Sequence, residues 1–145
     1  MKRTQTTSTL LPTRKEPRIL KGLPYLLNQI RQIKEADEYT IKCSERDITR
    51  WNVTIDQEVI RPYTFKSAND LLRWSMMSSK EAAVHLEIKF SVDYPKKPPF
   101  VRVVWPRFEY QTGHVTVGGS VCAEWLTYQG WSEMSVESLL RNIIM

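Results

Sequence analysis

The sequence has little of what builds disulfide frameworks, metal centres or membrane spans. Its 145 residues include two cysteines and two histidines, and two cysteines cannot form the disulfide network that holds a small secreted domain together. No apolar run approaches the roughly 18 residues of a membrane-spanning helix, and the N-terminus has no apolar stretch like that of a signal peptide. We therefore expect a protein of the cytoplasm, the nucleus or both, with no membrane partner and no bound cofactor.

Acidic residues are scarce in one segment, the first 24 residues. This segment holds six lysines and arginines against the single acid Glu16, which accounts for the whole formal net charge of +5. The remaining 121 residues contain 15 basic and 15 acidic side chains. A basic groove over the folded body is therefore not expected, and nucleic acid is not predicted as a partner. An adaptor that binds nucleic acid or acidic lipid through this basic segment stays open as an alternative.

The residues that are present predict one globular domain behind a short tail. Hydrophobic residues make up 41% of the chain and charged residues 26%, which is typical of a globular fold. Residues 1–14 are rich in threonine and cannot bury enough apolar surface to fold. We predict a flexible basic tail over 1–14 and a core domain over 15–145.

The spacing of apolar residues predicts an α+β fold. A stripe with spacings of three and four indicates an amphipathic helix from Leu23 to Asp37. The period then changes to two, which predicts a four-stranded antiparallel meander covered by helix on one face. The expected strands cover 39–44, 51–56, 84–93 and 100–105.

Two features interrupt the predicted meander. A capping-box pattern at Ser67-Ala-Asn-Asp70 predicts an extra short helix before the third strand, and the three prolines of 94–99 end that strand. In the third strand we expect Phe90 and Val92 to face the core, while Glu87 lies on the opposite, solvated face.

A long irregular segment follows the fourth strand. Residues 106–132 show no strong period and contain three of the five glycines of the chain, clustered within 113–119, followed by Cys122. Long segments without secondary structure inside compact domains are usually functional. Residues 132–145 then predict a helix that closes the chain.

These elements occur in an order that resembles the ubiquitin-conjugating enzyme (UBC) fold. The residues that carry the resemblance are Tyr94-Pro-x-x-Pro-Pro99, a strand, Gly118-Gly-Ser-Val-Cys122-Ala-Glu-Trp-Leu126, Gly130-Trp-Ser132 and a helix. The strand Phe100-Val-Arg-Val-Val104, the Gly-Gly-x-x-Cys approach and the extra helix before strand three are most similar to the Q-type branch. The likeness spans about residues 17–145.

The resemblance implies both a fold and an activity. The fold is an N-terminal helix on a four-stranded antiparallel meander, then a cysteine-bearing loop and a C-terminal helix, with the last helices of the family core apparently lacking here. The activity is acceptance of ubiquitin, or a ubiquitin-like modifier, as a thioester from an activating enzyme and its transfer to a protein substrate, usually on lysine. The alternative is a catalytically inactive variant that serves as a scaffold binding ubiquitin or ligases.

The two cysteines have different contexts. Cys43 lies in the apolar phase of the first strand and is most simply a small buried hydrophobe. Cys122 follows two glycines in the long loop, where a side chain can stay accessible. By the resemblance Cys122 is the catalytic cysteine, and an incidental loop cysteine is the alternative. A zinc site made by both cysteines and both histidines is disfavoured, because no pair has the spacing of a chelating motif.

One motif of the resembled family is missing. Typical members have a His-Pro-Asn triplet whose asparagine precedes the cysteine by eight positions, and this chain has His114 there. We hypothesise that His114 donates a hydrogen bond to the developing oxyanion or holds the loop that does so; a solvated loop histidine is the alternative. Glu124 follows the cysteine by two positions and could orient an incoming amine, although a solvated charge is the simpler interpretation.

The resemblance also implies partner surfaces. In that family the first helix and the proline-rich loop before strand four receive the activating enzyme and ligases. The residues of this chain at the corresponding positions are Lys15, Arg18, Lys21, Lys96 and Lys97, and Trp131 begins a further segment of ligase contacts.

Overall fold

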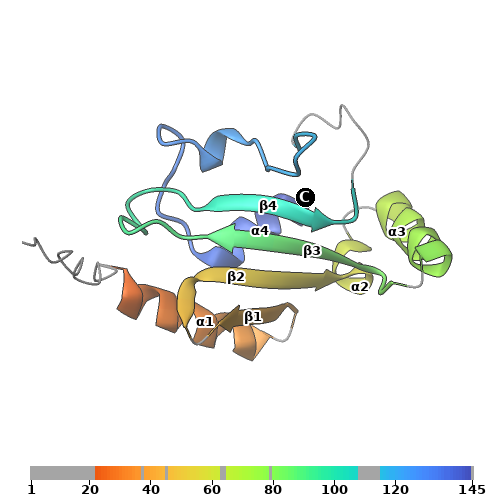
Figure 1. Cartoon of the computed structure of the whole chain (residues 1–145), viewed down its shortest axis with the longest axis horizontal. Helices are drawn as coiled ribbons and strands as arrows, with labels where there is room; N and C mark the ends of the chain where they lie inside the picture. The colour runs from red at the N-terminus through yellow and green to blue at the C-terminus, as the bar shows by residue number, and fades with distance from the viewer. Residues whose placement is uncertain are drawn as a thin grey trace, which may run out of the picture.

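The structure is a computed structural model that describes residues 22–36, 38–44, 46–62, 65–78, 80–107 and 115–144. The elements in chain order are α1 (Leu23–Ala36), β1 (Thr40–Ser44), β2 (Asp47–Asp56), α2 (Gln57–Ile60), α3 (Phe65–Ser78), β3 (Ala83–Lys89), β4 (Phe100–Trp105), a 3₁₀ turn η1 (Glu124–Leu126) and α4 (Val136–Ile144) (Figure 1). The predicted tail 1–14, the basic residues Lys15, Arg18 and Lys21, and His114 lie outside the described residues.

The four strands form one antiparallel sheet in the order β1-β2-β3-β4, which confirms the predicted α+β meander. In β1, Ile41 lies opposite Val53 and Cys43 lies opposite Trp51. Trp51 and Val53 are almost fully buried. Every second residue of the strands therefore faces the core, as the period of two predicts.

The core lies between one face of the sheet and the helices α1 and α4. Leu26 and Ile33 of α1 are completely buried together with Leu139 and Leu140 of α4. In Figure 1 α4 lies behind the sheet, and no described helix crosses the front of β2, β3 and β4. One sheet face is thus covered and the other is open, as expected for an antiparallel sheet.

The first helix matches its prediction and the last one is shorter than predicted. α1 begins at Leu23, with Pro24 in its first turn where a missing N–H costs nothing. α4 begins at Val136 rather than Ser132, because Ser135 caps it: its Oγ accepts a hydrogen bond from the Ser138 N–H at 3.1 Å. The Gln29 side chain of α1 accepts the Val136 N–H at 3.0 Å and ties the two helices together.

The structure corrects the predicted elements in four places. β2 begins at Asp47, four residues before its predicted start at 51. The sequence pattern does not predict the short helix α2, and α3 begins at Phe65, two residues before the Ser67 predicted as its cap. β3 ends at Lys89, so Phe90 reaches the core from outside the strand and Val92 is exposed. Phe90 packs edge-on against Trp51, with ring centroids 4.7 Å apart, and its N–H donates to the Thr49 carbonyl of β2 at 2.8 Å.

The expectation that Glu87 is solvated is also wrong. Glu87 is only 8% exposed although it faces the open side of the sheet. Its carboxylate contacts three cations: Arg102 Nη2 at 3.0 Å, Lys89 Nζ at 3.4 Å and Arg50 Nε at 3.7 Å. The long side chains from the neighbouring strands cover the carboxylate, which the alternation of one strand cannot reveal.

Replacing Glu87 with glutamine is expected to lower the free energy of unfolding by about 1–3 kcal/mol, because three clustered cations lose their counter-charge. Urea denaturation measures the change. The matched control is Glu58→Gln, since the Glu58 side chain is 64% exposed in its pair with Arg61 and the same charge removal there should cost about 0–1 kcal/mol. Equal effects of the two variants would contradict the role assigned to Glu87.

Tyr94 occupies the centre of an aromatic cluster and carries an orphan hydroxyl. Its ring contacts Tyr25, Phe90 and Trp131, with centroids 4.6 to 6.3 Å away, and the residue is 1% exposed. Its hydroxyl is buried and finds no hydrogen-bond partner among the described residues. Burial also raises the pKa of this hydroxyl, so it stays neutral.

Replacing Tyr94 with phenylalanine is therefore expected to raise the free energy of unfolding by about 1 kcal/mol, because an unsatisfied buried hydroxyl is removed while the ring packing stays. The melting temperature should rise by about 2–4 °C. Tyr25→Phe is the control, because Tyr25 is only half-buried and its hydroxyl can bond to water. Destabilisation by Tyr94→Phe would show that the hydroxyl has a partner.

Candidate active site

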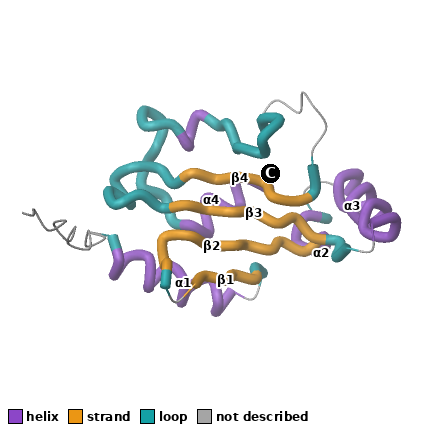
Figure 2. Tube along the Cα trace, viewed as in Figure 1, coloured by secondary structure: helices purple, strands orange, loops and turns teal. Residues whose placement is uncertain are grey.

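The segment that leads to Cys122 is attached to the free edge of β4. The Val103 N–H donates to the Gly119 carbonyl at 2.8 Å, and the Val121 N–H donates to the Val101 carbonyl at 2.9 Å. These two bonds extend the sheet by a short strand-like piece beyond its fourth strand (Figure 2). Cys122 is the next residue after Val121, so its backbone position is set by β4.

The approach to the cysteine is a tight hairpin. The Thr116 N–H donates to the Ser120 carbonyl at 2.9 Å, and the Gly119 N–H donates to the Thr116 carbonyl at 2.8 Å. The Thr116 hydroxyl oxygen also accepts the Ser120 N–H at 3.1 Å. The loop before Cys122 is therefore held by its own hydrogen bonds as well as by β4.

Gly119 is required by this geometry in two ways. Its φ is +87°, which side chains rarely adopt. A Cβ added there would also lie 2.3 Å from the Val103 carbonyl oxygen. Gly118, by contrast, has open space around it, because a Cβ at that position would meet no atom closer than the Thr116 hydroxyl oxygen at 4.0 Å. Of the two glycines, only the second brings the chain against β4.

The two cysteines differ in exposure, and Cys43 is less buried than predicted. Cys122 is exposed, whereas Cys43 is half-buried in β1 and packs against the core. Both are free thiols. Glu124, predicted as a solvated charge or an amine-orienting group, is exposed at the start of η1.

The residues after Cys122 form a second compact turn. The Glu124 carbonyl accepts the Thr127 N–H at 2.9 Å and the Thr127 hydroxyl at 2.6 Å. The Thr127 oxygen in turn accepts the Gly130 N–H at 3.1 Å. A Cβ on Gly130 would lie 2.2 Å from the Glu124 carbonyl oxygen, so the turn closes tightly only with glycine.

Trp131 links this turn to the proline-rich loop. Its indole N–H donates to the Pro95 carbonyl at 2.6 Å, and its ring lies 6.3 Å from that of Tyr94. Trp131 is half-buried, so much of the side chain predicted to bind partners is used to join two loops.

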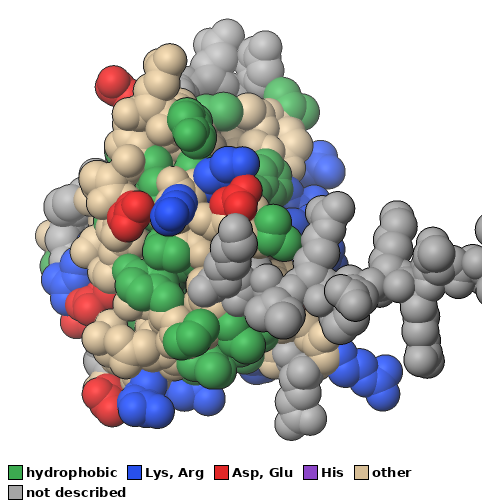
Figure 3. Space-filling view, turned by 90° about the vertical axis from the view of Figure 1, so that its left-hand side faces the viewer, with side chains coloured by type: hydrophobic (Ala, Val, Ile, Leu, Met, Phe, Trp, Pro, Cys, Tyr) green, Lys and Arg blue, Asp and Glu red, His purple; other side chains and the backbone are tan. Residues whose placement is uncertain are grey.

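The start of α1 packs against the same loop. A Cβ added to Gly22 would lie 2.1 Å from the Tyr94 carbonyl oxygen, which shows how closely the two segments approach. Lys96 and Lys97 are exposed on this loop, and Lys97 pairs with Asp93 at 2.8 Å. The Asp93 carboxylate raises the pKa of Lys97. Figure 3 views this end of the molecule and shows basic, acidic and hydrophobic side chains interspersed.

The described residues contain neither a metal centre nor a membrane span. No group of three or more His, Cys, Asp or Glu side chains in the described ranges is placed to hold a metal ion. In the same part of the chain, no helix has the length and apolar character to cross a bilayer.

Comparisons with known proteins identify the fold and the family. No protein-family model matches the chain. The structure of human ubiquitin-conjugating enzyme E2 G1 superposes with a TM-score of 0.63 at 20% identity, over 87% of this chain and 93% of that one. A ubiquitin-conjugating enzyme E2 from Plasmodium vivax superposes with a TM-score of 0.61 over 83% of this chain and 95% of that one. At such identities these likenesses establish the UBC fold, as predicted.

Sequence similarity to two curated proteins identifies the family. Human ubiquitin-conjugating enzyme E2 Q-like protein 1 is 30% identical over 104 residues, 71% of this chain and 58% of that protein. Human ubiquitin-conjugating enzyme E2 Q1 is 33% identical over 129 residues, 81% of this chain and 28% of that protein. The chain belongs to the ubiquitin-conjugating enzyme family, close to its Q-type branch. It spans little more than half the length of the first relative and under a third of the second.

The sequence pattern does not identify the residues that hold the cysteine segment in place. Arg102 is one of them: its backbone pairs with Ser120, and its side chain donates to Glu87 at 3.0 Å. Thr127 is another, since it closes the turn after η1. The glycines were the available signal, but the carbonyl that Gly119 approaches lies on β4, which the sequence does not place beside it.

Proposed function

We propose that this chain accepts ubiquitin, or a ubiquitin-like modifier, as a thioester on Cys122 and transfers it to a protein substrate. The observation that supports this most is an exposed thiol at the end of a strand-like segment bound to β4, in a chain with the UBC fold. An exposed cysteine on a rigidly held backbone suits acyl transfer, because the nucleophile is accessible and its position is defined.

The proposed first step is transthiolation. The Cys122 thiolate attacks the modifier's carbonyl carbon in its thioester with the activating enzyme; a new carbon–sulfur bond forms, the old one breaks, and the activating enzyme's thiolate leaves. One thioester replaces another, so the step is close to energy-neutral and needs no strong base at Cys122.

The proposed second step is attack by a substrate amine on the Cys122 thioester. The amine nitrogen bonds to the carbonyl carbon, an oxyanion develops, the Cys122 sulfur leaves and the amine loses a proton. Glu124 is the exposed carboxylate nearest in sequence to Cys122 and is proposed to orient the amine. A donor to the oxyanion accelerates this step, and His114 is proposed for that role or for holding the loop.

Replacing His114 with alanine is expected to slow discharge of the thioester to free lysine by about 10²-fold, the usual cost of losing one oxyanion donor. Single-turnover discharge of loaded protein measures the rate. Loading should change much less, because transthiolation demands less of an oxyanion donor. His85→Ala serves as the control, since His85 lies in β3 with its ring bonded to Thr54. Wild-type discharge by the His114 variant would remove this residue from the mechanism.

The proposed partners are the modifier, its activating enzyme, ligases and the protein substrate. The activating enzyme and ligases are proposed to dock where α1 begins and where the loop carries Lys96 and Lys97. Lys15, Arg18 and Lys21 precede α1 and are proposed to extend this surface. The contacts of Gly22 and Trp131 with the loop support a single continuous surface.

The function is tested by incubation of the protein with activating enzyme, ATP and ubiquitin. We expect a one-to-one adduct on a non-reducing gel that disappears with a thiol reductant. The assay is repeated with other ubiquitin-like modifiers and their own activating enzymes, because the sequence does not define the modifier. Absence of an adduct with all of them would contradict the proposal and favour an inactive binding scaffold.

A further inference from the structure

The helix α3 exposes several large apolar side chains. Within its described side chains, 70–78, Leu71 is buried and joins the main core cluster. Those that are exposed, with their exposed fractions, are Leu72 (41%), Trp74 (59%), Met76 (79%) and Met77 (84%). A single exposed apolar residue is ordinary on a protein surface. Four of them gathered within one short stretch of helix form a patch, which marks an interaction site.

The exposed side chains lie on one broad arc of the helix. At about 100° per residue, Leu72 and Met76 lie on one flank of this arc, Trp74 lies on the other flank, and Met77 lies between them. Leu71 points to the opposite side, toward the core. The helix is therefore divided into a side that faces the body and an outward side. We call the outward side the α3 arc, which consists of Asp70, Leu72, Arg73, Trp74, Met76 and Met77.

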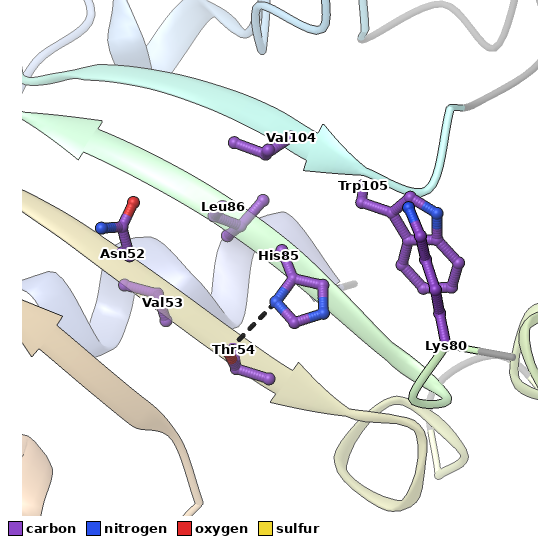
Figure 4. Close-up of a pocket in the computed structure, with 8 residues that line it drawn as sticks. All are labelled: Asn52, Val53, Thr54, Lys80, His85, Leu86, Val104 and Trp105. Atoms are coloured by element: carbon purple, nitrogen blue, oxygen red, sulfur yellow. Dashed lines mark hydrogen bonds between the residues drawn. The ribbon is translucent and has the colours of Figure 1, made fainter. Parts of the chain in front are cut away.

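The body of the protein holds α3 in a fixed orientation. The helix packs against α2, and the Ser75 hydroxyl donates to the Lys80 carbonyl just beyond its C-terminal end. Lys80 Nζ lies 5.4 Å from the ring centroid of Trp105, the last residue of β4, and both side chains line a small pocket (Figure 4). In Figure 1 α3 lies beyond the end of the sheet where β3 begins and β4 ends. The α3 arc is thus presented at one end of the molecule.

The charges on the α3 arc are balanced. Asp70 and Arg73 are both exposed and lie about one helical turn apart. Neither forms an ion pair with another described side chain. In a two-fold symmetric contact the same surface meets itself, so that each residue of one copy contacts its counterpart pair in the other. An acid and a base on one arc can therefore form two ion pairs between two copies, and the surface is complementary to itself.

This balance of charge favours a second copy over the other occupants. Helices that bind acidic lipid surfaces are rich in lysine and arginine, and nucleic acid is bound through several cations at once. The α3 arc has one cation, Arg73, and Asp70 offsets its charge. Apolar surface with one acid and one base is what a self-association surface requires.

We propose that two copies of this chain associate through their α3 arcs, with the apolar side chains in the contact and Asp70 of each copy paired with Arg73 of the other. Trp74 supplies a large apolar area, and Met76 and Met77 have flexible side chains that adapt to a facing surface. One short helix from each copy buries less than the roughly 1,200 Å² of a stable interface, so the dimer is weak, with a Kd of about 10–100 μM. The association does not depend on the proposed thioester chemistry.

Sedimentation velocity of the whole chain over a range of concentrations measures the association. Met77→Gln is expected to weaken the dimer about tenfold, because an apolar side chain that the contact buries is lost. The matched control is Leu27→Gln, which makes the same kind of change at a half-exposed apolar position of α1. It should leave the dimer constant within about twofold of wild type.

A charge exchange tests the pairing of the two copies. Asp70→Arg gives an arc with two cations and Arg73→Glu gives an arc with two acids, so each variant alone should dimerise about tenfold more weakly through like-charge repulsion. An equimolar mixture of the two variants restores opposite charges at both pairs. The mixture should form a heterodimer within about threefold of the wild-type affinity.

The proposal is wrong if the wild-type chain stays monomeric up to about 1 mM. Equal weakening by Met77→Gln and Leu27→Gln would mean that the association does not use the α3 arc. A mixture of the charge variants that associates no better than either one alone would exclude the two-fold pairing. Binding to phosphatidylcholine vesicles that requires Met77, without a dimer in solution, would assign the arc to a lipid surface. Melting curves of each variant check that the fold is intact.

Discussion

Replacing Cys122 with serine is expected to abolish the reductant-sensitive adduct. A serine hydroxyl is far less ionised than a thiol at neutral pH and a weaker nucleophile toward thioesters. Any product it does form is an oxyester, which thiol reductants do not cleave. On non-reducing gels the variant should therefore show no labile band, and at most a slow accumulation of a reductant-resistant one.

The matched control for this variant is Cys43→Ser. Cys43 is half-buried in β1 opposite Trp51, so its thiol is poorly accessible and its replacement should leave loading intact. A modest loss of stability is expected, because Cys43 packs against the core. A labile adduct that survives in Cys122→Ser but vanishes in Cys43→Ser would reverse the assignment of the two thiols.

Replacing Gly119 with alanine is expected to slow loading of Cys122 by about 10²-fold, although Cys122 itself is unchanged. The added Cβ would lie 2.3 Å from the Val103 carbonyl oxygen, at a φ of +87°. The backbone strain costs of order 1–3 kcal/mol. The chain can relieve this strain by breaking the hydrogen bond from the Val103 N–H to the Gly119 carbonyl. The cysteine then moves, and a displacement of about 1 Å is enough to cost this much in rate.

The control for this prediction is Gly118→Ala. Gly118 has no positive φ and open space around it, so its alanine variant should load within about threefold of wild type. Loading rates are measured under single turnover, with melting temperatures taken in parallel. Equal loading by the two glycine variants would contradict the claim that attachment to β4 positions Cys122.

The sequence predicts the regular elements because their signals are local. The start of α1 and both ends of β4 follow from apolar spacing within the segments themselves. The alternation in β1 likewise places Cys43 on the core side. In each case one element's pattern determines which face is buried, and the antiparallel meander follows from the order of the strands.

The sequence-based predictions fail where residues far apart in the chain determine whether a side chain is buried or what it contacts. Glu87 is buried because cations from β2 and β4 cover it, and no pattern within β3 contains that information. The sequence also does not reveal that the Trp131 indole N–H donates to the Pro95 carbonyl, 36 residues earlier in the chain. The role of Gly119 depends on the Val103 carbonyl of β4, which tertiary structure brings to it.

The candidate site can be found from the sequence in outline. The loop context and the family pattern select Cys122, and its exposure in the structure agrees with a nucleophile. The attachment of its segment to β4 could not be predicted, because the segment has no strand period of its own. His114 lies outside the described residues, so its role stays a prediction.

The most direct test of the proposed chemistry is mass spectrometry of the loaded protein. After reaction with activating enzyme, ATP and ubiquitin or another modifier, the protein is quenched in acid, and proteolytic peptides are mapped without reductant. Thioester formation at Cys122 predicts a mass increase of one modifier, attached through its C-terminus to Cys122 and released by thiols. Attachment to Cys43 or to lysine alone, or no mass increase with any modifier tested, would contradict it.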